Sequence, residues 1–502
     1  MTKVSKVFTH FQIHHRLIFL RKKKFIFRNV IFLFCILNGQ STHAGLQDVT
    51  SEKDSLIKEL SSTIAGGLEY LAQIQIKESI EGKQYAGEWP TEMVMQHGFF
   101  LLGGRRKAMD SNCFSVASTH NILAKIYLEN NAYQAIPALL SPAFQLLQQY
   151  KNGDRYNFWN LLPPNKKLFR GDTLFPKVPV RRPTQFKLRS KYINKAANVV
   201  EDADDTGLAY TAQILWKKID STRTYPEKKI APLFDEYRDL NRKNRHWYNF
   251  INESREDENS GAYLTWHAKE FAFKKWDIAK VAFHNATFYL PFSECYPFAY
   301  KPYLPYGSND LDAVVNANIL STLALHGETD ALGYADAVQY LIKKCEQQKF
   351  DRVATYYPNR FQLSYAVANA YDSGVIELEK CKPILTNYLL KKQRKNGSWK
   401  SAPHINHGDP IQSTAYALNC LLLFHRPQIQ NMEKEIKNAV VYLLNNSRKD
   451  GQQVSWKGGV MFSGGTVVRT GLFWKSDAYT TALVLRALIM YKNYLENAGH
   501  KK

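Results

Sequence analysis

Six segments of the chain carry small and aliphatic residues at nearly every position, a pattern typical of helices that are buried on all sides. Each segment begins with polar, often acidic residues, followed by a hydroxyl or amide residue. They cover residues 110–127, 202–216, 309–325, 359–371, 408–424 and 476–491. One unit that recurs along the chain in this way indicates a repeat architecture.

Each buried segment follows a more amphipathic one, in which Lys and Glu lie on one face and Leu, Ile and Val on the other. The amphipathic segments cover residues 54–75, 133–150, 225–240, 329–348, 374–393 and 431–446. Outer and inner helices in strict alternation predict an all-α fold, a single (α/α)6 toroid of six helical hairpins with parallel inner helices. Strand-like alternation is scarce, and we expect it only near the end, in residues 460–469.

Two long connections interrupt the alternation of outer and inner segments, at about residues 151–200 and 241–308. The first is rich in Pro, Arg and Lys, and the second is packed with aromatic residues. Connections of this length are usually functional or disordered. We expect them to cover the end of the ring at which the inner helices begin.

The first 44 residues have the pattern of a signal peptide. A long basic region is followed by the short apolar run VIFLFCIL and by a small-residue cleavage pattern ending at Ala44. The apolar run is too short to span a bilayer. We therefore expect residues 1–44 to be removed, export to the periplasm or the medium, and a toroid domain over residues 45–502; an uncleaved anchor is the alternative.

Charge and cysteine content change this picture little. The chain has 67 Lys and Arg against 45 Asp and Glu, which favours anionic lipid or acidic envelope polymers as neighbours. No compact basic cluster interleaved with aromatics is present, so we expect no nucleic-acid partner. The six cysteines include no C-x-x-C pair, and buried free thiols are the expectation, with one disulfide as an alternative.

Acidic residues stand at the start of the buried segments. In a parallel ring these starts share one mouth, so Asp110, Asp409 and Asp477 are read as helix caps. Asp312 lies at the same mouth and is a candidate substrate-binding residue. His404 and His407 beside Asp409 form only a thin metal-like cluster, and we predict neither a metal site nor a cofactor.

The DADDTG start at residues 202–207 is different, because one helix start needs one cap and three carboxylates crowd here. Like charges at that range raise the pKa of one acid, so Asp202, Asp204 or Asp205 can stay protonated in a dry cavity. A protonated carboxyl group held by its neighbours is a good general acid. Capping and the binding of a hard cation such as Ca²⁺ or Mg²⁺ are the alternatives.

VVEDADDTGLAY resembles the D-x-D-D-T motif of class II terpene cyclases, the squalene–hopene cyclase family, within the superfamily of α/α toroids that includes protein prenyltransferases. QRKNGSW, from Gln393 to Trp399, resembles the Q-x-x-x-G-x-W repeat of that family, and QYAGEWP and KDGQQVSW look like degraded copies. The resemblance implies that Asp204 donates a proton to an isoprenoid, positioned by Asp202 and Asp205. Gly207 stands where the family usually has Ala. We expect a structural role for the repeat.

Aromatic faces stabilise carbocations through cation–π attraction. The candidates near helix starts or in the long connections are Trp159, Trp247, Trp266, Tyr303, Tyr306, Phe473 and Trp474. Packing of the barrel mouth is the alternative for any single ring.

Two classes of function remain open, together with a toroid that has no chemistry. The first is a terpene-cyclase-like enzyme, an isomerase that acts on an apolar isoprenoid by acid initiation. The second is a glycan-active enzyme or glycan-binding protein of the cell envelope, with paired carboxylates at about 5–10 Å. The motifs favour the first, whereas export and Asp312 favour the second.

Overall fold

The computed structural model describes residues 44–95, 107–162, 180–181, 183–184, 199–222, 228–241, 259–268, 309–351, 353–401, 409–464 and 472–499. The chain divides into two compact units, Met1–Lys58 and Glu59–Lys502. In the first unit the described residues are the beginning of helix α2 (Ala44–Ile74). The predicted signal peptide lies almost wholly outside the described residues. No described helix is both long and apolar enough to cross a membrane.

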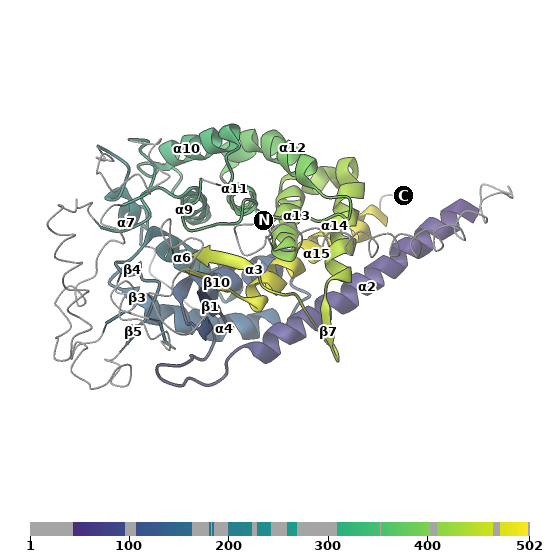
Figure 1. Cartoon of the computed structure of the whole chain (residues 1–502), viewed down its shortest axis with the longest axis horizontal. Helices are drawn as coiled ribbons and strands as arrows, with labels where there is room; N and C mark the ends of the chain where they lie inside the picture. The colour runs from purple at the N-terminus through teal and green to yellow at the C-terminus, as the bar shows by residue number, and fades with distance from the viewer. Residues whose placement is uncertain are drawn as a thin grey trace, which may run out of the picture. The chain divides into compact units, whose positions relative to one another are not determined.

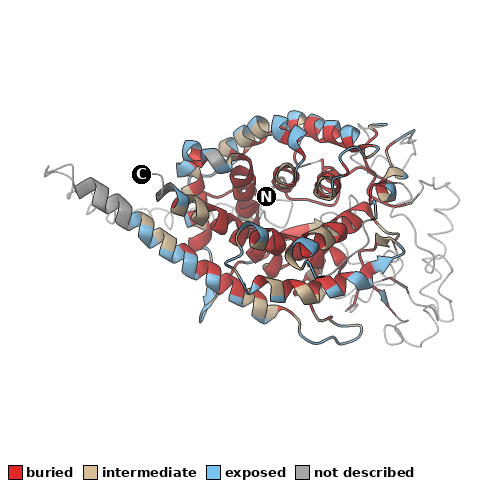
Figure 2. Cartoon of the chain, turned by 180° about the vertical axis from the view of Figure 1, so that it is seen from behind, coloured by how far each residue is buried: buried red, intermediate tan, exposed pale blue. Residues whose placement is uncertain are grey.

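In the second unit, six helices form a closed ring. Each packs against the next and the last returns to the first, in the order α3 (Cys113–Glu129), α6 (Ala203–Ile219), α9 (Ala313–His326), α11 (Gln362–Asp372), α13 (Pro410–His425) and α15 (Asp477–Gly499). These are the segments predicted to be inner helices, and Figure 2 shows the helices of the ring almost wholly buried.

The inner helices run parallel, because their starts meet one another and so do their ends. At the starts, Tyr357 just before α11 donates to Asp204 at the beginning of α6. At the ends, Arg426 after α13 pairs with Glu129, the last residue of α3. This arrangement gives the ring one acidic mouth, as the sequence predicted.

Outer helices flank this ring (Figure 1). They are the part of α2 from residue 59 on, α4 (Ile136–Leu147), α7 (Pro232–Asp235), α10 (Tyr334–Gln347), α12 (Lys382–Lys392) and α14 (Glu433–Asn445). Short 3-10 turns precede or follow some of them, at η3 (Gln148–Tyr150), η9 (Ile376–Cys381) and η10 (Arg426–Met432). The prediction of one outer helix over residues 374–393 was therefore too simple, since η9 precedes α12.

The third outer helix was predicted over residues 225–240, and among its described residues only the single turn α7 is helical. Pro232 starts this turn at the first helical position. Proline has no backbone N–H with which to continue the hydrogen-bond ladder of a helix that would arrive from upstream. The six-hairpin plan is thus met in its inner ring and only in part outside it.

The all-α prediction was incomplete, because strands cover part of the molecule. An antiparallel four-stranded sheet has the order β2-β1-β10-β9. Its strands are β1 (Glu92–Met95), β2 (Lys107–Met109), β9 (Val460–Ser463) and β10 (Leu472–Lys475), and β9 lies where strand alternation was expected. Glu92 pairs with Lys475 and Phe473 with Ser463. Two-stranded pairs are β3 (Lys151–Asn152) with β4 (Arg155–Tyr156), β5 (Leu161–Leu162) with β6 (Val180–Arg181), and β7 (Arg448–Asp450) with β8 (Gln453–Ser455).

The Q-x-x-x-G-x-W repeat joins outer helices, as predicted. Gln393 donates from Nε2 to the carbonyl of Glu435 in α14 (2.9 Å), and Trp399 donates from Nε1 to the carbonyl of Leu389 (2.8 Å). Gly397 has φ +82°, and a Cβ there would meet the Asn438 carbonyl oxygen at 2.2 Å. The glycine is required by both its backbone conformation and this close approach.

The same joint occurs near the start of the second unit with different spacing. Gln75 donates to the carbonyl of Leu139 in α4 (2.8 Å), and Trp89 donates to the carbonyl of Leu71 (3.0 Å). A third copy keeps the tryptophan contact, from Trp456 to the carbonyl of Leu443 (2.8 Å). The glutamine of the first copy was missed because a hairpin-like insertion separates Gln75 from its tryptophan.

Candidate functional site

The three carboxylates of DADDTG lie at the beginning of α6 and have different positions in the helix. Asp202 is the N-cap, and its side chain accepts from the backbone N–H of Asp205 (2.7 Å). Asp204 and Asp205 stand in the first turn, and all three are buried. One of the three acids therefore meets the need for a cap, and the other two are left for another purpose.

Two polar side chains from other parts of the ring hold Asp204, one from α9 and one from the segment before α11. Asn318 of α9 donates from Nδ2 to its Oδ1 (2.8 Å), and the hydroxyl of Tyr357 donates to its Oδ2. Burial raises the pKa of Asp204 to about 7, and the negative charge of Asp202 acts in the same direction, while the two hydrogen bonds lower it. At neutral pH this carboxyl group is thus poised between its acid and its base form.

Asp202 and Asp205 form a coupled pair behind this acid. Burial raises the pKa of Asp202 to about 6. Burial, followed by the charge of Asp202, raises the pKa of Asp205 well above its usual range. Because two adjacent buried carboxylates cannot both ionise readily, Asp205 keeps its proton and Asp202 carries the charge. Asp202 thereby supplies the negative neighbour that keeps Asp204 protonated.

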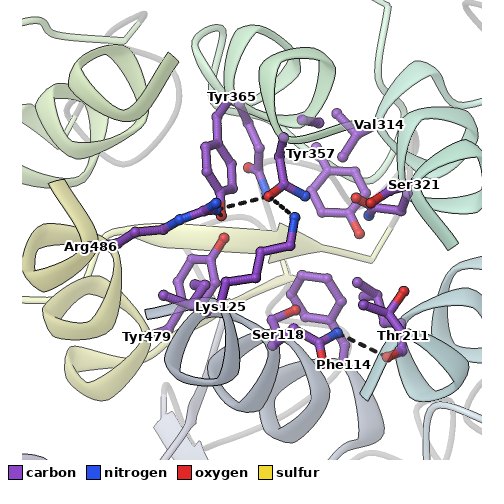
Figure 3. Close-up of a pocket in the computed structure, with 17 residues that line it drawn as sticks. Phe114, Ser118, Lys125, Thr211, Val314, Ser321, Tyr357, Tyr365, Tyr479 and Arg486 are labelled. Carbon is purple, nitrogen blue, oxygen red and sulfur yellow. Dashed lines mark hydrogen bonds between the residues drawn. The ribbon is translucent and has the colours of Figure 1, made fainter. Parts of the chain in front are cut away.

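A cavity lies inside the ring next to this acid, and Figure 3 shows the side chains that surround it. Both partners of Asp204, Asn318 and Tyr357, line it, whereas Asp204 stands one hydrogen bond behind them. The other lining residues are Phe114, Ser118, Asn121, Ile122, Lys125, Leu208, Thr211, Val314, Ser321, Gln362, Tyr365, Ala366, Asn369, Tyr479 and Arg486. The wall is therefore aromatic and polar near the acid and carries two cations elsewhere.

Aromatic rings continue from the cavity wall toward the sheet. Phe462 of β9 lies 5.4 Å from Phe114, 5.9 Å from Tyr357 and 5.8 Å from Tyr356, measured between ring centroids. The ring of Phe114 lies 5.7 Å from that of Tyr357. These rings surround the acid end with polarisable faces. The sequence motifs did not single out Phe114, Tyr357 or Phe462.

Two of the predicted aromatic residues bind Asp110 and do not line the cavity. Trp159 and Trp474 both donate from Nε1 to Oδ2 of Asp110, at 3.1 and 2.7 Å. The N-cap of α3 is Asn112, which accepts from the backbone N–H of Ser115, so the capping role predicted for Asp110 was wrong. Burial raises the pKa of Asp110 to about 6, and the indole donors lower it.

The other predicted binding residues have separate surroundings. Trp266 donates from Nε1 to the Tyr356 hydroxyl (2.8 Å). Phe473 packs with Val460 in a small cluster on the sheet. Trp247, Tyr303 and Tyr306 lie outside the described residues, as do His404 and His407. None of Trp159, Trp266, Phe473 and Trp474 lines the cavity next to Asp204.

Asp312 is a helix cap. Its Oδ1 accepts from the backbone N–H groups of Val314 and Val315 at the start of α9, and its Oδ2 accepts from the backbone N–H of Tyr356 (2.9 Å). Burial raises the pKa of this carboxyl group to about 7, and those hydrogen bonds lower it. Asp312 therefore supports the ring mouth as a helix cap, and it does not line the cavity. Across the described residues, no group of His, Cys, Asp and Glu has a metal-binding arrangement.

Comparison with known proteins gives matches among solved structures only. No family model and no curated protein matches the sequence. The type II terpene cyclase MstE from Scytonema, as a variant in complex with geranylgeranyl dihydroxybenzoate (substrate), has a TM-score of 0.48 at 13% identity over 88% of this chain and 99% of that chain. The apo form of MstE has a TM-score of 0.46 at 14% identity, over 87% and 99%. A cellobiose 2-epimerase from Bacillus thermoamylovorans has a TM-score of 0.45 at 10% identity, over 88% and 99%.

The resemblance that the motifs predicted thus recurs among solved structures. At these identities and TM-scores it says nothing about a substrate or a reaction of this chain. The chemistry has to be argued from the site itself.

Proposed function

We propose that this protein is an acid-initiated cyclase or isomerase of an apolar isoprenoid, with Asp204 as the proton donor. The observation that carries the proposal is a buried carboxyl group with a pKa of about 7, whose two hydrogen-bonding partners both line the cavity. A general acid works best when its pKa lies near the working pH.

The reaction would begin when the side chain of Asn318 or Tyr357 moves aside and opens Asp204 to the cavity. The O–H bond of Asp204 then breaks, and its proton forms a C–H bond at one end of a substrate double bond. The other carbon becomes a cation, which a neighbouring double bond can attack to close a ring. Loss of a proton to water from the last cation ends the reaction, so product and substrate are isomers. Asp204 regains its proton from solvent.

The surroundings suit such a cation. The faces of Phe114 and Tyr357 border the cavity, and a cation over an aromatic face gains about 0.5–2 kcal/mol. Ionised Asp204, left after proton transfer, is stabilised by the donors Asn318 and Tyr357. The two charges that the first step creates therefore each have partners already in position.

A glycan-active enzyme is less well supported. Glycoside hydrolysis needs two carboxyl groups that both reach the substrate. Asp312 was the expected second carboxylate, and it caps α9 without lining the cavity.

The test uses the purified protein and a set of linear polyprenyl compounds that share one chain length and differ at one end. Asp204→Asn keeps the shape of the side chain and removes the acid. We expect product formation to fall about 10²- to 10⁴-fold, the usual contribution of a general acid. Asp477→Asn is the matched control, because Asp477 also begins an inner helix and its carboxylate faces Arg448 instead of the cavity. Turnover that survives in Asp204→Asn, or no cyclised product from any polyprene, would refute the proposal.

Export remains a proposal of its own, based on the basic region and the VIFLFCIL run. N-terminal sequencing of protein recovered after expression with its full leader tests it. Cleavage after Ala44 is the expected result, and an intact N-terminus in the recovered protein contradicts it.

A further inference from the structure

Three buried cysteines lie close together where the outer helices pack against the ring. Cys345 is in the last turn of α10, Cys381 is the last residue of η9, and Cys420 is inside α13. Each carries a free thiol, and their exposed fractions are 0%, 0% and 1%. The turn η9 packs against α10, and it leads directly into α12, which is a neighbour of α10 in the outer layer (Figure 1).

Two of these thiols are in direct contact. The thiol of Cys345 is hydrogen-bonded to that of Cys381. This hydrogen bond, followed by burial, raises the pKa of Cys345 well above its usual range, so Cys345 holds the proton and donates it to the sulfur of Cys381. Burial is the main cause of the raised pKa of Cys420, which has Cys381 as a neighbour. The contacting pair is therefore Cys345 and Cys381, with Cys420 beside it.

The chain between Cys345 and Cys381 leaves the outer layer, crosses the mouth of the ring and returns to the outer layer. It carries Tyr357, which donates to Asp204, and the whole of α11. Tyr365 and Asn369 of α11 line the cavity. A bond between the two sulfurs would thus close a loop that holds both a partner of the acid and one wall of the cavity.

The fourth described cysteine has other surroundings. The thiol of Cys113 donates to Asp205 at the start of α6, and the charge of Asp202 also acts on it. Cys35 belongs to the predicted signal peptide, and Cys295 lies outside the described residues. The pair of contacting thiols is therefore separate from the acid site.

Two thiols in contact need little movement to form a disulfide. Rotation about their Cα–Cβ bonds brings the sulfurs from hydrogen-bond contact to the bonded distance of about 2.05 Å. The reactive species is a thiolate, and in the folded ring both thiols are fully buried while that of Cys345 holds its proton. The bond therefore forms while the segment folds, before burial closes off the sulfurs.

We propose that Cys345 and Cys381 form a disulfide bond when the protein folds in the presence of a thiol–disulfide oxidant, and that this bond closes the loop that carries Tyr357 and α11. Each thiol loses a proton, and the two electrons released reduce the disulfide of the oxidant to a dithiol. Such oxidants act in the compartments to which exported proteins are delivered. The inference does not depend on the proposed reaction, and it rests on the proposed export only for the source of the oxidant in the cell.

Peptide mapping after refolding tests the pairing. The purified protein is reduced, denatured and refolded in a buffer of oxidised and reduced glutathione, and the remaining free thiols are alkylated under denaturing conditions. Trypsin then releases CEQQK, which contains Cys345, and CKPILTNYLLK, which contains Cys381. We expect mass spectrometry to find these two peptides joined, and to find them separate after reduction. Both peptides alkylated, or either one joined to the peptide of Cys420, would overturn the inference.

A second measurement is the response of the melting temperature to a reductant. A disulfide restricts the unfolded chain, so reduction of the refolded protein should lower the melting temperature by about 5 °C. Cys345→Ala should remove this response. Cys420→Ala is the matched control, because it deletes the third thiol of the cluster and keeps the contacting pair, and it should retain the response. An equal response in Cys345→Ala would mean that another pair of cysteines is joined, and it would overturn the pairing.

Protein recovered after expression with its full leader is mapped in the same way, which separates this inference from that of export. A cleaved leader together with the joined peptides supports both. An intact leader with free thiols in the cell, but joined peptides after refolding with glutathione, contradicts export and supports the pairing. Free thiols in a protein whose leader has been cleaved would overturn the inference and leave export standing.

Discussion

At the scale of single residues, the site depends on whether the buried carboxyl group of Asp204 keeps its proton. Asp204 is held near pKa 7 by burial and by the charge of Asp202, against the two hydrogen bonds that favour its ionised form. The three carboxylates at the start of one helix allowed the raised pKa of one acid to be predicted from the sequence. Asn318 of α9 and Tyr357 before α11, which tune the acid, lie far along the chain from it, and no local motif marks them.

The pH dependence of the reaction follows from this pKa. In the proposed reaction the acid form of Asp204 is the active one, so activity should be highest below about pH 7 and fall as pH rises through 7, approaching a tenfold loss per unit. Initial rates measured between pH 5 and 9 check this expectation. A rate that rises across the same range would assign the catalytic proton to another group.

Tyr357→Phe should move that profile. Loss of the hydroxyl donor removes stabilisation of ionised Asp204, about 1.5–3 kcal/mol for a hydrogen bond to a charged group, so the pKa should rise by about 1–2 units. The falling limb of the rate profile then shifts to higher pH. Tyr356→Phe serves as the control, because the hydroxyl of Tyr356 bonds to Asp310 instead. An unshifted limb in Tyr357→Phe would mean that this contact does not tune the acid.

At the scale of helices and strands, the prediction from sequence succeeded where the pattern of a single element is decisive. The inner helices were found because they are apolar on every face. The structural role of Gln393 and Trp399 was predicted because their segment resembles a known repeat. The sheet was missed, since β1 and β10 pair across more than 370 residues of sequence. Lys125 and Arg486 were missed as well, although charged residues inside all-apolar helices are a signal that could have been used.

Gly207 offers a test at this scale. It lies inside α6, and a Cβ added there would meet Thr322 Oγ1 at 3.4 Å, an ordinary contact. Gly207→Ala should therefore stabilise the protein by about 0.5–1 kcal/mol, because glycine loses more backbone entropy in a helix. Chemical denaturation measures the change. Gly397→Ala provides the contrast and should destabilise the protein, because Gly397 has a positive φ and no room for a methyl group.

At the scale of the whole second unit, ion pairs join inner helices at the end of the ring opposite the acidic mouth. Arg486 contacts Glu129 at 3.5 Å and Asp372 at 2.9 Å from two other helices, and removing it breaks both of these direct contacts, whereas Lys125 reaches Asp372 only at 3.9 Å. We expect Arg486→Met to lower the free energy of unfolding by about 3–5 kcal/mol, as when one partner of a buried ion pair is lost.

Lys125→Met should behave in the opposite way. It removes the surplus cation and leaves the two arginines with two carboxylates, so we expect the free energy of unfolding to stay the same or rise. Urea unfolding of both variants at pH 6 compares them directly. A loss as large as that of Arg486→Met would show that Lys125 is essential to the ionic balance and not in excess.

The parallel direction of the inner helices has an electrical consequence. Peptide dipoles that point the same way add up, with positive ends at the mouth and negative ends where Lys125 and Arg486 stand. This effect acts within about one turn of each helix end. In the proposed reaction, a positive centre formed beside Asp204 would therefore meet the positive helix ends at the mouth, which favour its movement deeper into the cavity and away from the ionised carboxylate.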